Sequence, residues 1–385
     1  MIQDLSIYIH YPFCKSKCPY CDFNSHVRDG VDYLRFLQAY EKELEFFAAK
    51  VGKRKIKTIF FGGGTPSLMP IFLVAGILKK ISQLWVIGEN CEITLEANPT
   101  SFESSKFKDL CDVGINRLSL GIQALNDDDL KFLGREHSSA EAIATIENAA
   151  KIFDNFSFDL IYARPNQSIE SWVAELRRAI NFGTKHLSLY QLTIEKGTKF
   201  FSQYQQKKFE LPSEELSAQL YETTAQITKD AGFSDYEISN YAKKNYESQH
   251  NLVYWQGGDY IGIGAGAHSR IFFENEKNRS AIMMTNEPLA WLKRVEEQGN
   301  GIQTSQKVSA EELKQELILM GLRLKEGVSI RVFENFFDKN IKEILDISRL
   351  QTLENQGFIE ISDNFVKIKN DKRILTNSII SKILV

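Results

Sequence analysis

The chain has 385 residues, of which 43% are hydrophobic and 25% charged, as in an ordinary globular protein of two or three domains. Its 47 basic and 50 acidic residues give a net charge of −3, so no basic field predicts a nucleic-acid partner. The chain lacks an apolar run of the roughly 20 residues that span a membrane, and its first residues lack the basic region and apolar run typical of a signal peptide. We therefore expect a cytoplasmic protein without a transmembrane segment.

The first 200 residues alternate between strand and helix patterns. Strands are predicted at Leu5–His10, Lys57–Phe61, Cys91–Ala97, Arg117–Gly121, Ser157–Tyr162 and His186–Gln191. Helices are predicted between them, at Val31–Lys50, Pro70–Leu84, Asp127–Leu133, Ser139–Phe153 and Ile169–Asn181. Six βα units in succession predict a parallel sheet with right-handed crossovers. Periodicity alone leaves both a doubly wound sheet and a barrel open.

Polar residues collect at the ends of these strands. A cysteine-rich loop follows the first strand and a glycine run follows the second. Glu96 ends the third strand, Gln123 follows the fourth and Gln191 ends the sixth, whereas Asp159 lies inside the fifth. Polar groups at the C-terminal ends of parallel strands are typical of the active-site mouth of an α/β barrel.

The pattern changes after residue 200. Residues 199–208 are predicted as a polar connection, residues 213–230 as a long helix and residues 233–275 as irregular. Helices follow near 309–324, 328–337 and 340–355, then strands at Phe358–Ile361 and Phe365–Ile368 and a last helix at Thr376–Leu384. Helices followed by a small hairpin favour a winged-helix-like α+β domain. We divide the chain into 1–200, 201–300 as a barrel extension, and 301–385.

Three of the five cysteines lie within eight residues, in Cys14-Lys-Ser-Lys-Cys18-Pro-Tyr-Cys21. Structural zinc sites and ordinary iron–sulfur clusters take four protein ligands. Three thiolates on a four-iron cluster would leave one iron with an open, reactive position. A zinc site also stays open, with His10 or His26 as the fourth ligand. Cys91 and Cys111, which stand alone in apolar surroundings, are expected to be small buried residues.

Two further features suit a small-molecule site. Gly62-Gly63-Gly64-Thr65-Pro66 follows a strand, and glycines allow the backbone to approach a ligand closely. The run lacks the Gly-Lys-Ser/Thr of a P-loop. Glu96 and Asp159 are carboxylates on or beside strands, where a charge is costly unless it is paired. An ordinary buried ion pair is the alternative for each.

Among the histidines, His250 stands out because it opens His250-Asn-Leu-Val-Tyr-Trp255, which joins a possible axial ligand to two large aromatics. An aromatic packing patch is the alternative. His137, His186 and His268 are scattered and are assigned no metal role. Gly262-Ile-Gly-Ala-Gly266 follows no clear βαβ unit and is predicted to be a packed turn.

The spacing C-x3-C-x2-C, with an aromatic before the last cysteine, resembles the cluster motif of the radical SAM superfamily. Together with Tyr8-Ile-His10-Tyr-Pro-Phe-Cys14, the glycine run and His250–Trp255, the chain is similar end to end to the HemW-type haem chaperones. These are relatives of the oxygen-independent coproporphyrinogen III oxidases. The resemblance implies a partial (β/α)6 barrel with a helical C-terminal domain.

The resemblance also implies the site residues. Cys14, Cys18 and Cys21 would hold a 4Fe–4S cluster, whose open iron chelates S-adenosylmethionine (SAM). Contacts with SAM are implied for Tyr8, Tyr20, Gly63, Gly64, Thr65, Glu96, Gln123, Arg135 and Asp159, with the glycines and Thr65 at its methionyl end. His250 becomes the candidate for holding haem as cargo. The implied partners are an electron donor and recipient haem proteins, membrane-associated ones among them.

One departure distinguishes the relatives. The oxidases have a further cysteine two residues after the third, where this chain has Phe23. They also carry a longer N-terminal arm, whereas 13 residues precede the first cysteine here. Both features favour a haem chaperone without coproporphyrinogen oxidase activity. The oxidase, and a zinc-binding module without redox chemistry, remain as alternatives.

Overall fold

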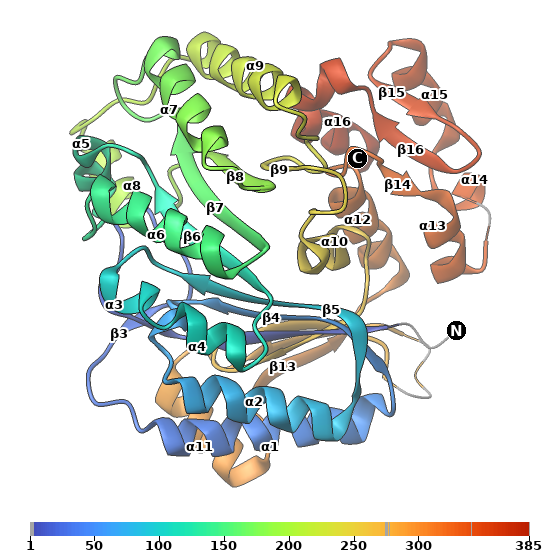
Figure 1. Ribbon diagram of the computed structural model, residues 1–385. Helices are drawn as coiled ribbons and strands as arrows, with labels where there is room; N and C mark the ends of the chain where they lie inside the picture. The colour runs from blue at the N-terminus through green and yellow to red at the C-terminus, as the bar shows by residue number, and fades with distance from the viewer. Residues whose placement is uncertain (1–3, 274–275, 277, 340, 385) are drawn as a thin grey trace.

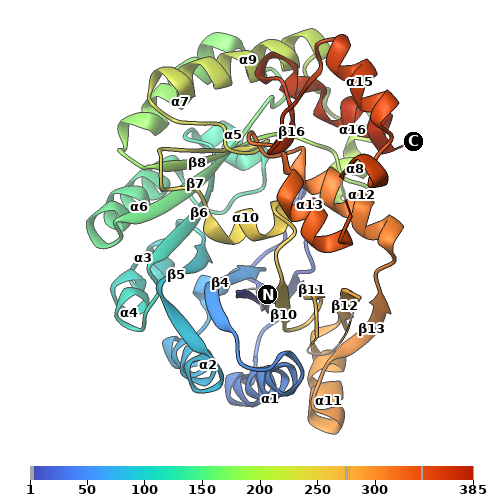
Figure 2. The ribbon, with the colours of Figure 1, turned by 90° about the vertical axis from the view of Figure 1, so that its right-hand side faces the viewer.

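The computed structural model describes residues 4–273, 276, 278–339 and 341–384. Its central feature is a curved sheet, seen in Figures 1 and 2. Six of its strands are parallel and lie side by side in chain order: β1 (Leu5–Tyr11), β4 (Lys55–Gly63), β5 (Val86–Ala97), β6 (Arg117–Gln123), β7 (Asn155–Tyr162) and β8 (His186–Gln191). A doubly wound sheet reverses its strand order at a switch point, and this run of strands does not. The barrel alternative is therefore correct.

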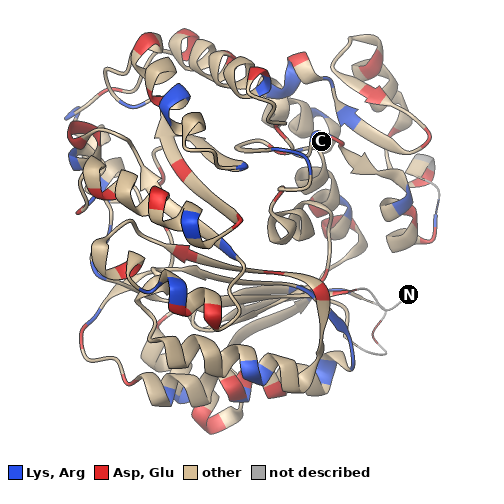
Figure 3. Ribbon diagram, viewed as in Figure 1, with Lys and Arg blue, Asp and Glu red and all other residues tan. Residues whose placement is uncertain are grey.

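Helices on the outer face connect the parallel strands (Figure 1). They are α1 (Tyr33–Val51), α2 (Ile71–Leu84), α3 (Ser101–Ser104), α4 (Phe107–Asp112), α5 (Asp127–Phe132), α6 (Ser139–Ile152) and α7 (Ile169–Asn181). Local sequence fixes where several of them begin. Ser138 and Glu141 form a capping box at the start of α6, which satisfies two free backbone N–H groups. Basic and acidic residues are interspersed along these elements (Figure 3).

The sheet extends beyond the six parallel strands on both sides. β10 (Tyr260–Ile263) pairs with β1 in parallel, and β11 (His268–Ile271), β12 (Ser280–Met284) and β13 (Ile302–Lys307) follow antiparallel. β9 (Asn240–Ala242) pairs with β8 at the other end. Within the described residues the sheet has eleven strands and runs from β13 to β9 without closing. A partial (β/α)6 barrel is thus confirmed.

Two predictions for the middle of the chain are wrong in part. The connection at 199–208 contains the helix α8 (Lys199–Gln205), and the irregular region 233–275 contains β9, β10, β11 and the helix α10 (Gln249–Trp255). The glycines in and after β10 make this strand difficult to predict from the sequence, because glycine is typical of turns. A Cβ on Gly262 would come within 2.2 Å of the His268 carbonyl oxygen, so this strand position requires glycine for close packing. The long helix α9 (Glu214–Asp230) and α11 (Pro288–Gln298) complete the region.

The C-terminal residues form a second hydrophobic core, which includes Leu317, Phe333 and Ile380. Its three-stranded sheet has the order β14 (Val328–Ser329), β16 (Phe365–Ile368), β15 (Ile359–Ile361). Its helices are α12 (Ala310–Gly321), α13 (Ile330–Phe337), α14 (Ile341–Ile344), α15 (Ile347–Asn355) and α16 (Thr376–Leu384). The winged-helix-like α+β domain is confirmed, although the helix expected at 340–355 is two helices and β14 was missed.

The C-terminal domain contacts the barrel through α12 and the segment after it. Arg270 of β11 forms an ion pair with Glu316 of α12 at 2.8 Å. Lys325 pairs with Asp235 at 2.6 Å, beside the end of α9. None of the helices in the described residues is long and apolar enough to cross a membrane.

Candidate functional site

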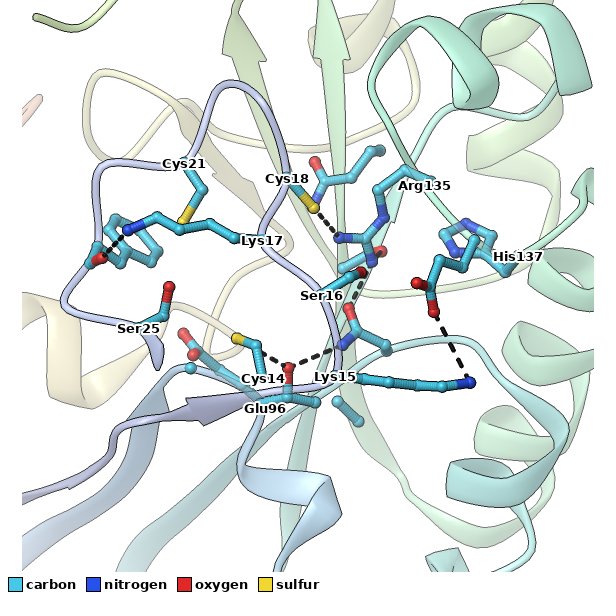
Figure 4. A pocket seen from close by; sticks show the side chains of 18 of the residues that line it. Cys14, Lys15, Ser16, Lys17, Cys18, Cys21, Ser25, Glu96, Arg135 and His137 are labelled. Carbon is cyan, nitrogen blue, oxygen red and sulfur yellow. Dashed lines mark hydrogen bonds and ion pairs between the residues drawn. The ribbon is translucent and has the colours of Figure 1, made fainter. Parts of the chain in front are cut away.

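The cysteine loop is closed at its base by a short parallel strand pair. β2 (Phe13–Cys14) pairs with β3 (His26–Val27), and the His26 N–H donates to the Pro12 carbonyl at 2.7 Å. Inside the loop, the Cys21 N–H donates to the Cys18 carbonyl at 3.1 Å. All three thiols are free and line one cavity of about 170 Å³. Figure 4 shows their sulfur atoms turned toward its interior.

The glycine run after β4 packs against this loop. The Gly64 N–H donates to the Tyr11 carbonyl at 2.7 Å, and the Thr65 N–H donates to the Phe13 carbonyl at 2.9 Å. A Cβ on Gly64 would lie 2.4 Å from the Phe13 carbonyl oxygen. Gly63 adopts φ +110°, which favours glycine. The glycines therefore position the cysteine loop, and their backbone also lines the cavity.

Burial and hydrogen bonding act on the thiols in opposite directions. Burial raises the pKa of Cys14, while the Thr65 hydroxyl, 3.4 Å from its sulfur, favours the thiolate. Burial likewise raises the pKa of Cys21. The Arg135 guanidinium lies 3.3 Å from the Cys18 sulfur and supplies a positive charge beside it. Metal binding would deprotonate all three thiols.

The donor set fits a cluster better than a single ion. Among the described residues, no three His, Cys, Asp or Glu side chains converge enough to hold one metal ion. A four-iron cluster is wider than an ion, and cysteines at its separate corners surround it rather than meet at one point. Three thiols around one cavity match that requirement.

Glu96 and Asp159 enter the same cavity from β5 and β7. Within the described residues neither carboxylate forms an ion pair, although the positive charges of Arg117 and Arg135 act on Asp159. Burial and the charge of Asp159 raise the pKa of Glu96 to about 8. Burial raises the pKa of Asp159 to about 6. The Gly63 N–H donates to Glu96 at 3.3 Å. Two half-buried carboxylates that form no ion pair in the described residues are suited to a cationic or hydroxyl-bearing ligand.

Arg135 connects the cysteine loop to the strand ends. Its guanidinium donates to the Gly121 carbonyl at 2.8 Å and to the Asn98 side chain. Gln123, at the end of β6, has φ +71°, an unfavourable conformation for a residue other than glycine, and such strain is concentrated at functional sites. Asn98, Ser119 and Gly121 also line the cavity, and the sequence analysis missed them. The only sequence signal for Asn98 and Gly121 is a place at or near the C-terminal end of a strand, and Ser119, inside β6, has none.

The cavity brings together every predicted cluster and SAM residue except Tyr8, which lines a neighbouring cavity. His250, the haem candidate, does not line the first cavity or the second. Its ring is buried, with Nδ1 2.7 Å from the Thr58 hydroxyl and Nε2 2.7 Å from the Tyr254 hydroxyl. Burial lowers the pKa of His250 to about 3. Haem ligation by His250 stays a prediction, and it would require one of these hydrogen bonds to break.

The second cavity has a volume of about 590 Å³ and shares Phe23, Gly63 and Glu96 with the first. The strands β1, β10, β11 and β12 contribute side chains to it, together with the helices α10 and α12. Figure 2 shows how these elements are arranged. Its other lining residues are Tyr8, His10, Asn24, Tyr254, Trp255, Tyr260, Gly266, His268, Met283, Asn286 and Met320. The structure therefore places a larger, aromatic and thioether-lined space directly beside the cysteine cavity.

Known proteins match this chain over its whole length. The family model of the radical SAM superfamily matches residues 8–179, and that of the HemN C-terminal domain matches residues 308–370. The heme chaperone HemW of Escherichia coli (strain K12) is 34% identical over 388 residues, covering 100% of this chain and 99% of its own. The heme chaperone HemW of Haemophilus influenzae is 39% identical, covering 87% of this chain and 86% of its own.

A mitochondrial relative and a solved structure extend the comparison. Radical S-adenosyl methionine domain-containing protein 1 of Danio rerio is 34% identical and covers 99% of this chain. The structure of coproporphyrinogen III oxidase (HemN) from Escherichia coli superposes with a TM-score of 0.81, covering 99% of this chain and 90% of its own. Its 22% identity shows a shared fold and nothing more specific.

Proposed function

Because the chain belongs to the HemW-type family of radical SAM proteins, we propose that it is a haem chaperone that binds haem and passes it to recipient haem proteins. The observation that carries the proposal is the pair of adjoining cavities. One is lined by three thiols and by two half-buried carboxylates that form no ion pair in the described residues, and the other is large and lined by aromatic side chains and two methionine thioethers. A cytoplasmic location, an electron donor and membrane-associated recipients belong to the same proposal.

In this proposal Cys14, Cys18 and Cys21 hold a 4Fe–4S cluster, which supplies an open iron for SAM and a site for one electron. The protein's own groups orient SAM. Glu96 accepts a hydrogen bond from the amine of SAM, and Asp159 accepts from the ribose hydroxyls. The backbone of Gly63 and Gly64 lies along the methionyl end. Arg135 offsets negative charge at Cys18, from which it is 3.3 Å away.

The zinc alternative has less support because its candidate fourth ligands are already engaged. His10 Nε2 lies 2.9 Å from the Asn24 carbonyl oxygen, and His10 Nδ1 lies 3.0 Å from the Tyr8 hydroxyl. His26 Nε2 lies 3.2 Å from the Asn24 side-chain oxygen. A zinc site would have to break one of these contacts, whereas a cluster with an open iron needs no fourth protein ligand.

Phe23 favours the chaperone over the oxidase alternative. It occupies the position of the additional cysteine in the oxidases, and its side chain is 60% exposed where the two cavities adjoin. A decarboxylating oxidase must hold a propionate of its substrate beside SAM and then remove an electron. Phe23 offers neither a thiolate nor a polar group for those tasks.

A single anaerobically reconstituted sample tests the proposal. We expect it to bind one haem per chain, to pass that haem to an apo-haem protein, and to leave coproporphyrinogen III unchanged when SAM and dithionite are present. Conversion of coproporphyrinogen III at enzymatic rates would show that the protein is an oxidase rather than a chaperone. Failure to bind haem at all would overturn the proposed function.

A further inference from the structure

The second cavity is the part of the molecule that the cluster and SAM residues leave unexplained. Its volume of about 590 Å³ falls within the roughly 300–1,000 Å³ of small-molecule and cofactor sites. The strands β10, β11 and β12 contribute to it from the barrel extension, and α12 contributes from the C-terminal domain. The Arg270–Glu316 ion pair joins β11 to α12 at 2.8 Å. The cavity therefore depends on how the two domains pack together.

The histidines around this cavity differ in what their rings already bind. His10 lines it, and both of its ring nitrogens have partners, the Tyr8 hydroxyl and the Asn24 carbonyl. The ring of His250 stacks on Tyr8, and its two nitrogens contact the hydroxyls of Thr58 and Tyr254. His268 lines the cavity, and its ring has no hydrogen-bond partner among the described residues. His268 can therefore coordinate haem iron without breaking a hydrogen bond to another described residue.

The surroundings of His268 favour the neutral form of its imidazole. His268 is exposed at the cavity wall, where partial desolvation and then the positive charge of Arg270 lower its pKa. The neutral form has the free lone pair that binds haem iron.

Two thioethers lie near the same imidazole. His268 of β11 and Met283 of β12 are directly opposite each other in the antiparallel pair. Opposed residues point to the same face of a sheet, with Cβ atoms about 4.5–5.5 Å apart. Met320 reaches the cavity from α12. Imidazole and thioether are the side chains that occupy the axial positions of haem iron in c-type cytochromes.

Aromatic rings complete the wall and suit a flat, apolar macrocycle. Tyr254 and Tyr260 meet edge to face, with ring centroids 4.5 Å apart. The indole N–H of Trp255 is buried without a hydrogen-bond partner in the described part of the chain. A buried donor of this kind costs free energy until an acceptor arrives. The carboxylate of a haem propionate is such an acceptor.

We propose that haem binds in this second cavity with His268 as an axial ligand of its iron. The inference rests on the proposed haem-binding function and specifies its site. No motif singles out His268, because the contacts that favour it come from strands and a helix far apart in sequence. His250 instead holds Tyr254 in place through the 2.7 Å contact between His250 Nε2 and the Tyr254 hydroxyl.

The test compares the reconstituted wild-type protein with His268→Ala, with ferric haem as the titrant. We expect the Soret band and the electron paramagnetic resonance spectrum of the wild type to report imidazole ligation. His268→Ala should lose that signature and bind haem at least about tenfold more weakly. Added imidazole should restore the ligated spectrum, because it can occupy the space that the side chain leaves. A purely structural role for His268 would not produce this rescue.

Three controls make the result specific. His186→Gln changes a histidine that lines neither cavity and whose side chain contacts Tyr236, also outside both, so it should bind haem as the wild type does. Cluster absorbance and SAM affinity should be unchanged in His268→Ala, which shows that the variant is folded. Metal-free protoporphyrin IX should bind the wild type and His268→Ala within about twofold of each other, since it has no iron to ligate.

The possible failures are distinct. If the wild type binds haem and His268→Ala keeps the same spectrum and affinity, the inference is wrong and the proposed function stands. The inference is also wrong if His250→Gln, rather than His268→Ala, loses the ligated spectrum. A wild-type protein that binds no haem overturns the inference together with the proposed function.

Discussion

The two cavities lie side by side, but the chain builds them in different ways. The cysteine cavity is lined by consecutive parallel strands and by the loops that follow them, and all of its lining residues lie between positions 14 and 159. The second cavity is lined by residues from position 8 to position 320 and depends on the C-terminal domain. Chemistry that requires closely spaced residues leaves a motif in the sequence, whereas a site assembled from distant elements does not.

The largest expected effect comes from replacing a cysteine of the loop, which should affect the cysteine cavity far more than the second cavity. Cys14→Ala, Cys18→Ala or Cys21→Ala should each abolish the cluster, because a three-thiolate site has no spare ligand. Residues 11–30 should become less ordered, since metal binding and local folding are coupled. Iron content and visible absorbance after reconstitution provide the measurement.

The matched controls are Cys91→Ala and Cys111→Ala, which change cysteines outside both cavities. Both variants should retain the cluster. Haem binding should persist in all five variants, because the second cavity does not include the thiols, but it should weaken in the three loop variants, where Phe23 and Asn24 of the cavity wall become less ordered. Loss of the cluster in Cys91→Ala or Cys111→Ala would contradict the assignment of its ligands.

Glu96 is the next test, because it lies where the cavities meet. A hydrogen bond to a charged group is worth about 1.5–3 kcal/mol, so Glu96→Ala should weaken SAM binding about 10- to 150-fold. Isothermal titration calorimetry measures this effect, and the cluster content should be unchanged. Glu45→Ala, an exposed carboxylate of α1, is the matched control. An unaltered SAM affinity in Glu96→Ala would leave Glu96 with a structural role only.

The pH dependence of SAM binding refines that test. Burial and the charge of Asp159 raise the pKa of Glu96 to about 8, so below this pH the free protein holds a proton on Glu96. SAM must displace the proton if the carboxylate is to accept its amine. Affinity should therefore fall as pH is lowered through about 8, by up to about tenfold per unit. Glu96→Gln cannot titrate and should show a shallower slope, and equal slopes would exclude Glu96 as the titrating group.

The smallest expected effect concerns the packing of the two domains. Arg270→Ala removes the partly exposed ion pair that joins β11 to α12. Such pairs contribute about 0.2–1 kcal/mol, so haem affinity should fall about 1.5- to 5-fold. SAM affinity should stay constant, because the ion pair lies outside the cysteine cavity. Glu316→Ala should have the same effect as Arg270→Ala, and the double variant should cost little more than either change alone.

The features that could be predicted from the sequence are those built from closely spaced residues, and the features that could not be predicted depend on distant elements. Alternating patterns located the six parallel strands, and short-range spacing located the cysteine loop, the glycine run and the strand-end residues Glu96 and Gln123. Periodicity could not locate β10, because Gly262 resembles a turn residue although a neighbouring strand requires it. Nor could it indicate that His250 is buried between Thr58 and Tyr254, since these contacts depend on tertiary packing. For the same reason, no pattern set His268 apart.

In the proposed function one chain holds SAM and haem in two separate, adjoining cavities. Titration of haem into the reconstituted protein already saturated with radiolabelled SAM tests this arrangement most directly. We expect one haem to bind per chain while SAM stays bound, with a modest change in affinity through the shared Phe23, Gly63 and Glu96. Release of one SAM for each haem bound would show that the two compete for a single site, and separate cavities would then be wrong.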